Sequence, residues 1–331
     1  MRAKKQGSKG RGESKRKAEV KASAFSDWGG LLLLYLGLGL ASGLIWLRLA
    51  NLSALPSWHL EMVSGTAPAP NQYRPLTPWL AEALARAMGG NMVTAYFTLR
   101  AVTTGVTLFL FDRYLRAWFA PAAAAGGALC LAATIPFTYF AVVQESDPLN
   151  LLAFVLAYWA LAQGRDLWLI PLTLVGTLNR EAVAMIPAVY LLARWGQERP
   201  GRLAWRTVAM GGAWALAYGG MLAAYGGRAY YCNVVMLGLN LSSWIPTVHV
   251  ILMFGALWGL AFAGQKQGPV MLRRALWLAP PYVALHYVVA MAREVRVLLP
   301  LAPVLIPLSW WALFPEAVRP EAREEARERR A

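Results

Sequence analysis

The chain has 331 residues, of which 58% are hydrophobic and only 15% are charged, against roughly 25% charged in soluble domains. Apolar runs recur from Gly30 almost to the C-terminus, which excludes an ordinary soluble domain and predicts an all-α polytopic membrane protein. The net charge of +15 does not indicate a nucleic-acid partner, because the basic residues fall at the termini and in short loops between apolar runs.

The two ends of the chain are charged and lack apolar runs. Residues 1–24 carry nine Lys and Arg among Gly and Ser, which predicts a disordered basic cytoplasmic arm near anionic lipid headgroups. Residues 315–331 combine five Arg with five Glu, which predicts a solvated, charged cytoplasmic tail. The transmembrane bundle is therefore predicted over residues 25–314, with a large outer loop at 50–91.

Between these ends the apolar runs predict about ten membrane segments, several of them short or re-entrant. Placing successive loops on alternate sides puts three quarters of the Lys and Arg in the cytoplasm, which predicts that both termini are cytoplasmic. The predicted segments are 30–49, 92–111, 118–143, 148–163, 167–178, 182–193, 208–225, 248–264, 275–292 and 297–314.

The outer loop at 50–91 contains several prolines and then a helical pattern near Pro78–Met88. Glu82 and Arg86 are i,i+4 partners on the polar side of this pattern, and apolar residues occupy the other side. Such a helix is predicted to lie along the outer membrane interface.

Three polar residues, Asn179-Arg180-Glu181, interrupt a long apolar stretch. A charged side chain at bilayer depth costs about 2.5–3.5 kcal/mol, so these residues indicate a functional site, with a self-neutralising ion pair as the alternative. Four Arg follow within 194–206, so the next loop is predicted to be cytoplasmic. The triplet is then a turn between two helices of about 18 Å each, and it lines a cavity or is buried in protein.

Further polar residues of the predicted outer side fall at loop–helix junctions that must converge if the helices form one bundle. Arg binds phosphate oxygens with two donors and a carboxylate can deprotonate a hydroxyl, so the set suits an anionic substrate with a leaving phosphate. Structural alternatives are a helix cap at Ser146-Asp147-Pro148, interfacial anchoring and solvated charges. The candidates are His59, Glu61, Tyr73, Arg74, Glu145, Asp147, Asn179, Arg180, Glu181, Arg293, Glu294 and Arg296.

The remaining polar motifs are less informative. His286 lies inside a predicted span beside Tyr287, where a packed, hydrogen-bonded histidine is expected rather than a ligand. No Walker loop, nucleophile elbow or Cys/His metal cluster occurs in the sequence, which excludes the recognisable ATP-driven and zinc-dependent classes. The sequence leaves a divalent cation at the outer carboxylates open.

Four motifs follow one another along the chain: Tyr73-Arg74-Pro75-Leu76-Thr77-Pro78-Trp79-Leu80, Ser146-Asp147-Pro148, Leu178-Asn179-Arg180-Glu181 and Arg293-Glu294-Val295-Arg296-Val297. In this order they resemble bacterial membrane proteins that are similar to the GT-C glycosyltransferase superfamily, over about residues 30–313. The resemblance implies a GT-C-like bundle in the bacterial cytoplasmic (inner) membrane, with an extracytoplasmic active site. It also implies inverting transfer of a sugar from a polyprenyl-phosphate donor to a hydroxyl acceptor.

The same resemblance implies roles for individual residues. Glu61 or Asp147 would be the catalytic base, and Arg180, Arg293 and Arg296 would bind the donor phosphate. The expected partners are the lipid-linked sugar donor and membrane lipids, with a protein partner left open.

Two other functions fit the same residues. One is a transporter or lipid flippase with an outward charged cavity, for which broken helices are typical, although no internal repeat is visible. The other is a non-catalytic membrane scaffold subunit, which needs no converging charges.

Overall fold

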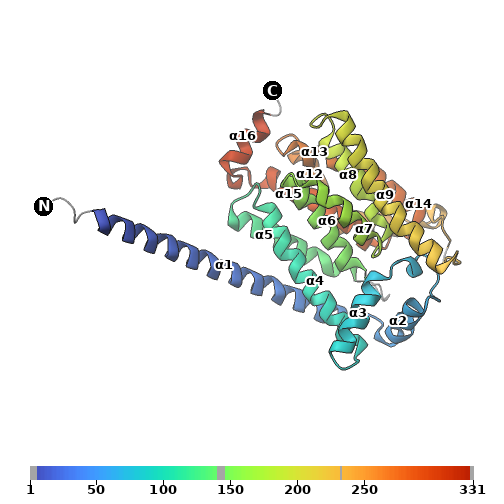
Figure 1. The fold of residues 1–331 in the computed structure, drawn as a ribbon. Coiled ribbons are helices and arrows are strands. Elements are labelled where there is room, and N and C mark those ends of the chain that lie inside the picture. The colour runs from blue at the N-terminus through green and yellow to red at the C-terminus, as the bar shows by residue number, and fades with distance from the viewer. Residues whose placement is uncertain (1–5, 140–145, 232, 329–331) are drawn as a thin grey trace.

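The computed structural model describes residues 6–139, 146–231 and 233–328 of the chain (Figure 1). Within these ranges the protein consists of α-helices and short 3-10 helices, with two isolated β-bridges and no strands. The all-α prediction is therefore confirmed for the described residues. In Figure 1 the helix α1 projects from the bundle at its N-terminal end, whereas the other helices lie close together.

The N-terminal third is built from five α-helices and three 3-10 helices. Their bounds are α1 Gln6–Leu49, η1 Leu52–Ala54, α2 Leu55–Ser64, η2 Asn71–Tyr73, α3 Leu76–Ala87, α4 Met92–Leu115, α5 Pro121–Thr134 and η3 Ile135–Thr138. The structure differs from the sequence prediction at the start, since residues 6–24 continue α1 where a disordered arm is expected. The apolar part of α1 provides a formed helix, and the Lys, Arg, Glu and Ala residues before it favour its extension, against the cost of Gly7, Gly10 and Gly12.

Close backbone approach joins α1 to α4. A Cβ atom added at Gly105 would lie 2.9 Å from the carbonyl oxygen of Tyr35, and one at Gly39 would meet the carbonyl oxygen of Ala101. Small residues at such crossings let two helices pack backbone to backbone, which is the usual way in which membrane helices associate.

The middle third contains the predicted pair of short helices. The bounds are α6 Asp147–Ala162, η4 Asp166–Trp168, α7 Leu169–Thr177, η5 Glu181–Ala184, α8 Met185–Arg194 and α9 Pro200–Tyr225. The helical pattern stops over residues 178–180, so the helix break lies where the sequence predicts it. α9 is peripheral, since only 17% of its most apolar window is buried inside the protein.

The C-terminal third supplies the centre of the bundle. Its bounds are α10 Leu237–Leu241, α11 Ile245–Phe254, α12 Leu257–Gly264, α13 Val270–Leu276, α14 Ala279–Val289, η6 Val295–Leu301, α15 Ala302–Leu313, η7 Pro315–Ala317 and α16 Pro320–Glu328. The apolar window within Val295–Leu313 is 89% buried, so η6 and α15 form the core of the molecule. The predicted segment 275–292 is divided between α13 and α14 ahead of Pro280, because proline cannot continue the preceding helix.

Among the described residues, five helices are long and apolar enough to cross a membrane, or six if α11 and α12, bent by 54° at their junction, count as one span. They indicate a membrane protein, but by length they fall short of the ten segments expected from the sequence. The difference lies in short helices: α6, with 16 residues, reaches only about 24 Å against a hydrocarbon core of about 30 Å. The five are Trp28–Leu49, Met92–Leu115, Pro121–Thr138, Pro200–Tyr225 and Val295–Leu313.

The predicted outer loop at 50–91 is joined to the segment that follows α9. The backbone amide of Ala69 donates to the carbonyl of Ala229 at 2.9 Å, and Tyr231 donates back to Ala69 at 3.2 Å. The Arg228 guanidinium donates to the carbonyl of Gly65 at 2.6 Å. The loop after α2 and the segment after α9 therefore form one layer over the end of the bundle where α6 begins.

Candidate functional site

The turn after α7 is attached to two other segments through Asn179. Its amide nitrogen donates to the carbonyl of Ser146 at 2.8 Å, and its amide oxygen accepts from the Thr77 hydroxyl at 2.6 Å. The backbone amide of Leu76 donates to the carbonyl of Leu178 at 3.0 Å. Asn179 is buried and so holds the starts of α3 and α6 against the turn. This contact places the residue after it, Arg180, beside the first residue of α6.

A buried carboxylate, Asp147, joins two arginines at this point. Arg180 donates to its Oδ1, and Arg296 Nη1 donates to its Oδ2 at 3.3 Å. Arg296 also donates through Nη2 to Glu294 at 2.7 Å. Asp147, Arg180 and Arg296 are each less than 9% exposed, so these charges are held inside the protein and pair with one another.

A second ion pair lies beside the first. Arg74 donates through Nε to Glu181 Oε2 at 2.8 Å, and its Nη2 donates to the other carboxylate oxygen. Burial raises the pKa of Glu181, but the Arg74 guanidinium outweighs burial and lowers this pKa to about 2. Burial likewise raises the pKa of Asp147, and Arg296 and Arg180 together bring it below the usual value. Both acids are therefore charged at neutral pH.

All of these charged residues except Asp147 border one cavity of about 500 Å³. Its charged end is formed by Arg74, Arg180, Arg296, Glu181 and Glu294. The remaining wall is aromatic and apolar, and the side chains that form it include Pro70, Met185, Tyr218, Tyr230, Tyr231, Val234, Met236, Tyr282, Leu285, His286, Val289 and Val297. A charged pocket end beside an apolar wall suits an amphiphilic ligand with an anionic group.

The charges of the network balance, since three guanidiniums face three carboxylates when Asp147 is included. A guanidinium carries five N–H donors, and the hydrogen bonds described above use one or two on each of the three arginines. Donors therefore remain that can bind oxygens of a ligand without breaking the ion pairs. The carboxylates hold the guanidiniums in fixed positions, which lowers the cost of binding.

Six of the predicted residues lie together at the cavity or in its ion pairs, namely Arg74, Asp147, Arg180, Glu181, Glu294 and Arg296. The other predicted residues lie elsewhere. Asn179 does not line the cavity but precedes Arg180, which does. Tyr73 is buried, and its hydroxyl donates to the carbonyl of Gly226 at 2.9 Å, so it fixes the outer loops. Arg293 is exposed and does not line the cavity, although it adjoins Glu294. Glu145 lies outside the described residues.

The two candidates of the first outer loop form a separate group. His59 is buried between the Tyr96 hydroxyl and the Glu82 carboxylate, each 2.9 Å from a ring nitrogen. Glu61 is exposed and does not line the cavity, because α2 buries His59 and Met62 and turns Glu61 toward the outside. The sequence expectation that Glu61 or His59 meets the arginine cluster is not met in this structure.

The aromatic and histidine residues of the cavity are absent from the sequence prediction. Tyr282 and His286 share one face of α14 at i,i+4 spacing, and both line the cavity. Neither ring nitrogen of His286 has a hydrogen-bond partner among the described residues, which differs from the hydrogen-bonded histidine expected from the sequence. The sequence signal that could have indicated these two residues is the i,i+4 spacing of polar side chains inside an apolar stretch.

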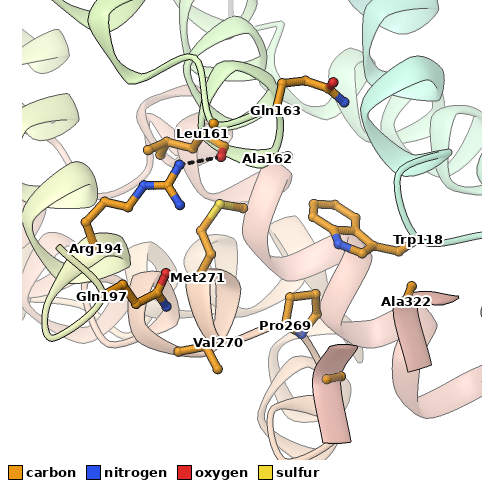
Figure 2. Close-up of a pocket in the computed structure, with 12 residues that line it drawn as sticks. Trp118, Leu161, Ala162, Gln163, Arg194, Gln197, Pro269, Val270, Met271 and Ala322 are labelled. Atoms are coloured by element: carbon orange, nitrogen blue, oxygen red, sulfur yellow. Dashed lines mark hydrogen bonds between the residues drawn. The ribbon is translucent and has the colours of Figure 1, made fainter. Parts of the chain in front are cut away.

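A second cavity, of about 310 Å³, lies at the other end of α6 (Figure 2). Its lining includes Arg194, which donates to the carbonyl of Leu161 at 2.8 Å and also pairs with the buried Asp166. The α16 helix contributes Ala322 to the wall. These polar contacts hold the end of α6 against the end of α8, which gives Arg194 a structural role.

Within the described ranges, no group of three or more His, Cys, Asp or Glu side chains is arranged to hold a metal ion. The carboxylates of the larger cavity are instead paired with arginines.

Comparison of the chain with protein-family models, with curated proteins and with solved structures finds no match. No relative identifies it. Function is therefore inferred from the geometry of the arginine cavity and from the motif resemblance of the sequence.

Proposed function

We propose that the protein is a membrane glycosyltransferase that moves a sugar from a polyprenyl-phosphate donor to a hydroxyl acceptor at the outer face of the bacterial inner membrane. The observation that carries the proposal is the convergence of Arg74, Arg180 and Arg296 on one cavity with an apolar wall. Guanidiniums recognise phosphate oxygens with two donors each, and an apolar wall accepts a prenyl chain.

The mouth of the cavity supports a lipid-linked ligand. Four lining residues, Tyr231, Val234, Leu285 and Val289, are about half exposed, so the cavity continues into an apolar outer surface. A polyprenyl chain can then remain in the membrane while its phosphate reaches the arginines. In the proposed topology of about ten membrane segments, short helices such as α7 and α8 form a re-entrant pair, and both termini are cytoplasmic.

The proposed reaction develops negative charge on the leaving phosphate. Three fixed guanidiniums would stabilise this charge, and such electrostatic stabilisation is the largest single contribution in many enzymes. Asp147 and Glu181 would hold these guanidiniums in place, since a carboxylate with a lowered pKa is a weak base.

A lipid flippase is the second candidate, and one observation favours it. Every described carboxylate that borders the cavity is paired with an arginine. The pocket can therefore bind a ligand but offers no unpaired acid to act as a base. A scaffold subunit is less favoured, because buried converging charges are costly and serve no purpose in a passive support.

Proteoliposomes test the proposal. The purified protein is reconstituted with radiolabelled polyprenyl-phosphate glucose or mannose and a membrane lipid extract as acceptor, and transferred label and released polyprenyl phosphate are measured. Wild type is expected to transfer label, and Arg180→Gln and Arg296→Gln to lose about 10²–10³-fold in rate. Arg180→Lys, which keeps the charge but not the two-donor geometry, is expected to be impaired as well.

The matched control is Arg86→Gln, which alters an exposed arginine of the outer helix α3 and is expected to leave transfer unchanged. Glu61→Gln is also expected to be active. Movement of a fluorescent polyprenyl phosphate between leaflets without any transfer by wild type would favour the flippase and refute the enzyme.

A further inference from the structure

His286 is a buried titratable side chain that the proposed reaction has not used. It is 2% exposed, borders the large cavity, and neither Nδ1 nor Nε2 makes a hydrogen bond of normal distance and angle among the described residues, although the Ala292 backbone lies close to the ring. Leaving a buried polar group unpaired costs about 1–3 kcal/mol, so such a group calls for an explanation. A ligand that supplies the missing hydrogen bond is the simplest one.

The position of His286 is fixed by Asn240. The amide nitrogen of Asn240 donates to the carbonyls of Tyr287 at 2.8 Å and Ala290 at 2.7 Å. Its amide oxygen accepts from the backbone of Ala292 at 2.9 Å. The C-terminal end of α14 and the loop leading to the arginine cluster are therefore held by one buried side chain.

Charged groups of the cluster lie close to this imidazole. Glu294, Arg180 and Arg296 are all near enough to act electrostatically on His286. All four residues line the same cavity, so one ligand can touch both the arginines and the imidazole.

We propose that His286 is the proton acceptor for the hydroxyl nucleophile in this cavity. This inference rests on the proposed glycosyltransferase function and deepens it. The carboxylates nearby are engaged with guanidiniums, whereas the imidazole has a nitrogen lone pair without a partner. A neutral imidazole is the side chain most often used as a general base.

The step balances in atoms and charge. The acceptor oxygen forms a bond to the anomeric carbon of the sugar as its proton passes to the unprotonated nitrogen of His286. The bond between the anomeric carbon and the phosphate oxygen breaks, and its electron pair stays on the phosphate. The donor monoanion becomes a phosphate dianion and the imidazole becomes a cation, so the total charge in the cavity is unchanged. Transfer of the proton from the imidazolium to the departing phosphate or to water restores the neutral histidine.

The test compares His286→Gln and His286→Asn with His249→Gln in proteoliposomes. His249 is an exposed histidine on α11 that does not line the cavity, which makes it the matched control. The probes are radiolabelled polyprenyl-phosphate glucose and mannose for transfer, and polyprenyl phosphate without sugar for binding. Both His286 variants are expected to transfer at least about 10²-fold more slowly and to bind polyprenyl phosphate within threefold of wild type. The control is expected to match wild type in both measurements.

The two proposals fail in distinguishable ways. Wild type that transfers sugar, together with His286 variants that retain activity within tenfold, would overturn the role of His286 and leave the enzyme standing. Wild type without transfer would overturn both. At least one of the two His286 variants must unfold within a few degrees of the wild-type midpoint, which shows that it is folded. Equal loss of binding and transfer in that folded variant would make His286 a structural residue and refute its role as proton acceptor.

Discussion

Asp147→Asn tests whether the arginine network is held together by charge. Asp147 joins two arginines, and Arg296 keeps Glu294 as a second partner. For Arg180, Asp147 is the one carboxylate within ion-pair distance in the described part of the chain. Asparagine keeps the volume and one acceptor oxygen, so the substitution removes a negative charge and leaves Arg180 buried without an ion-pair partner among the described residues.

The expected cost follows from the burial of the pair. Removing one partner of a buried ion pair destabilises a protein by about 3–5 kcal/mol, against about 0–1 kcal/mol for an exposed pair. A shift of about 2–4 °C per kcal/mol converts this to a lower unfolding midpoint, on the order of 10 °C. The control Arg86→Gln breaks an exposed pair on α3 and is expected to shift the midpoint by less than about 2 °C.

The assay is thermal unfolding of the purified protein in detergent, followed by tryptophan fluorescence. The double variant Asp147→Asn/Arg180→Gln removes both charges, so it is expected to recover at least half of the loss seen with Asp147→Asn. A midpoint for Asp147→Asn equal to wild type would refute the network as a stabilising feature. Strict additivity of the two single effects would show that the two side chains do not interact.

Three further predictions concern packing, loop anchoring and pH. Gly105→Leu is expected to destabilise by about 1–3 kcal/mol or more at the α1–α4 crossing, whereas Gly212→Leu, with open space around it, is expected to leave the unfolding midpoint unchanged. Asn240→Ala is expected to lower the midpoint and slow the transfer reaction, because three backbone groups lose their partner, while Asn51→Ala at an exposed site changes neither measurement. Glu181 has a folded pKa of about 2 against 4.5 as its ordinary value, so its contribution to stability is present above about pH 4.5 and is lost as the pH falls toward 2. The difference in midpoint between wild type and Glu181→Gln should be constant from pH 5 to 8 and shrink below 4.5, and a difference that instead grows on acidification would contradict the ion pair.

Local features of the structure were accessible from the sequence. The helix near Pro78–Met88 is present as α3, and the break at Asn179-Arg180-Glu181 separates α7 from η5 and α8. Both follow from patterns within about 15 residues: helical spacing of apolar side chains, proline at a helix start, and polar residues inside an apolar stretch. The number of full membrane spans was not accessible in this way, because apolar composition does not distinguish a long helix from two short ones.

The partners of the charged residues could not be derived from the sequence. Arg180 lies 33 positions from Asp147, Arg74 lies 107 from Glu181, and Arg296 lies 149 from Asp147. Which acid meets which base depends on how the helices cross and on the face that each side chain occupies. The first outer loop is an example, since α2 turns Glu61 outward and buries His59 against Tyr96 and Glu82, away from the arginine cavity.

The sequence by itself therefore determined the class of the protein, its helical composition and the site of the helix break, because these depend on side-chain chemistry repeated along short stretches. Only the tertiary structure decided that three arginines and three acids form two adjacent, charge-balanced ion-pair groups beside an apolar cavity. It also decided that His286 lies unpaired in that cavity, since whether a buried imidazole has a hydrogen-bond partner depends on segments distant in the chain.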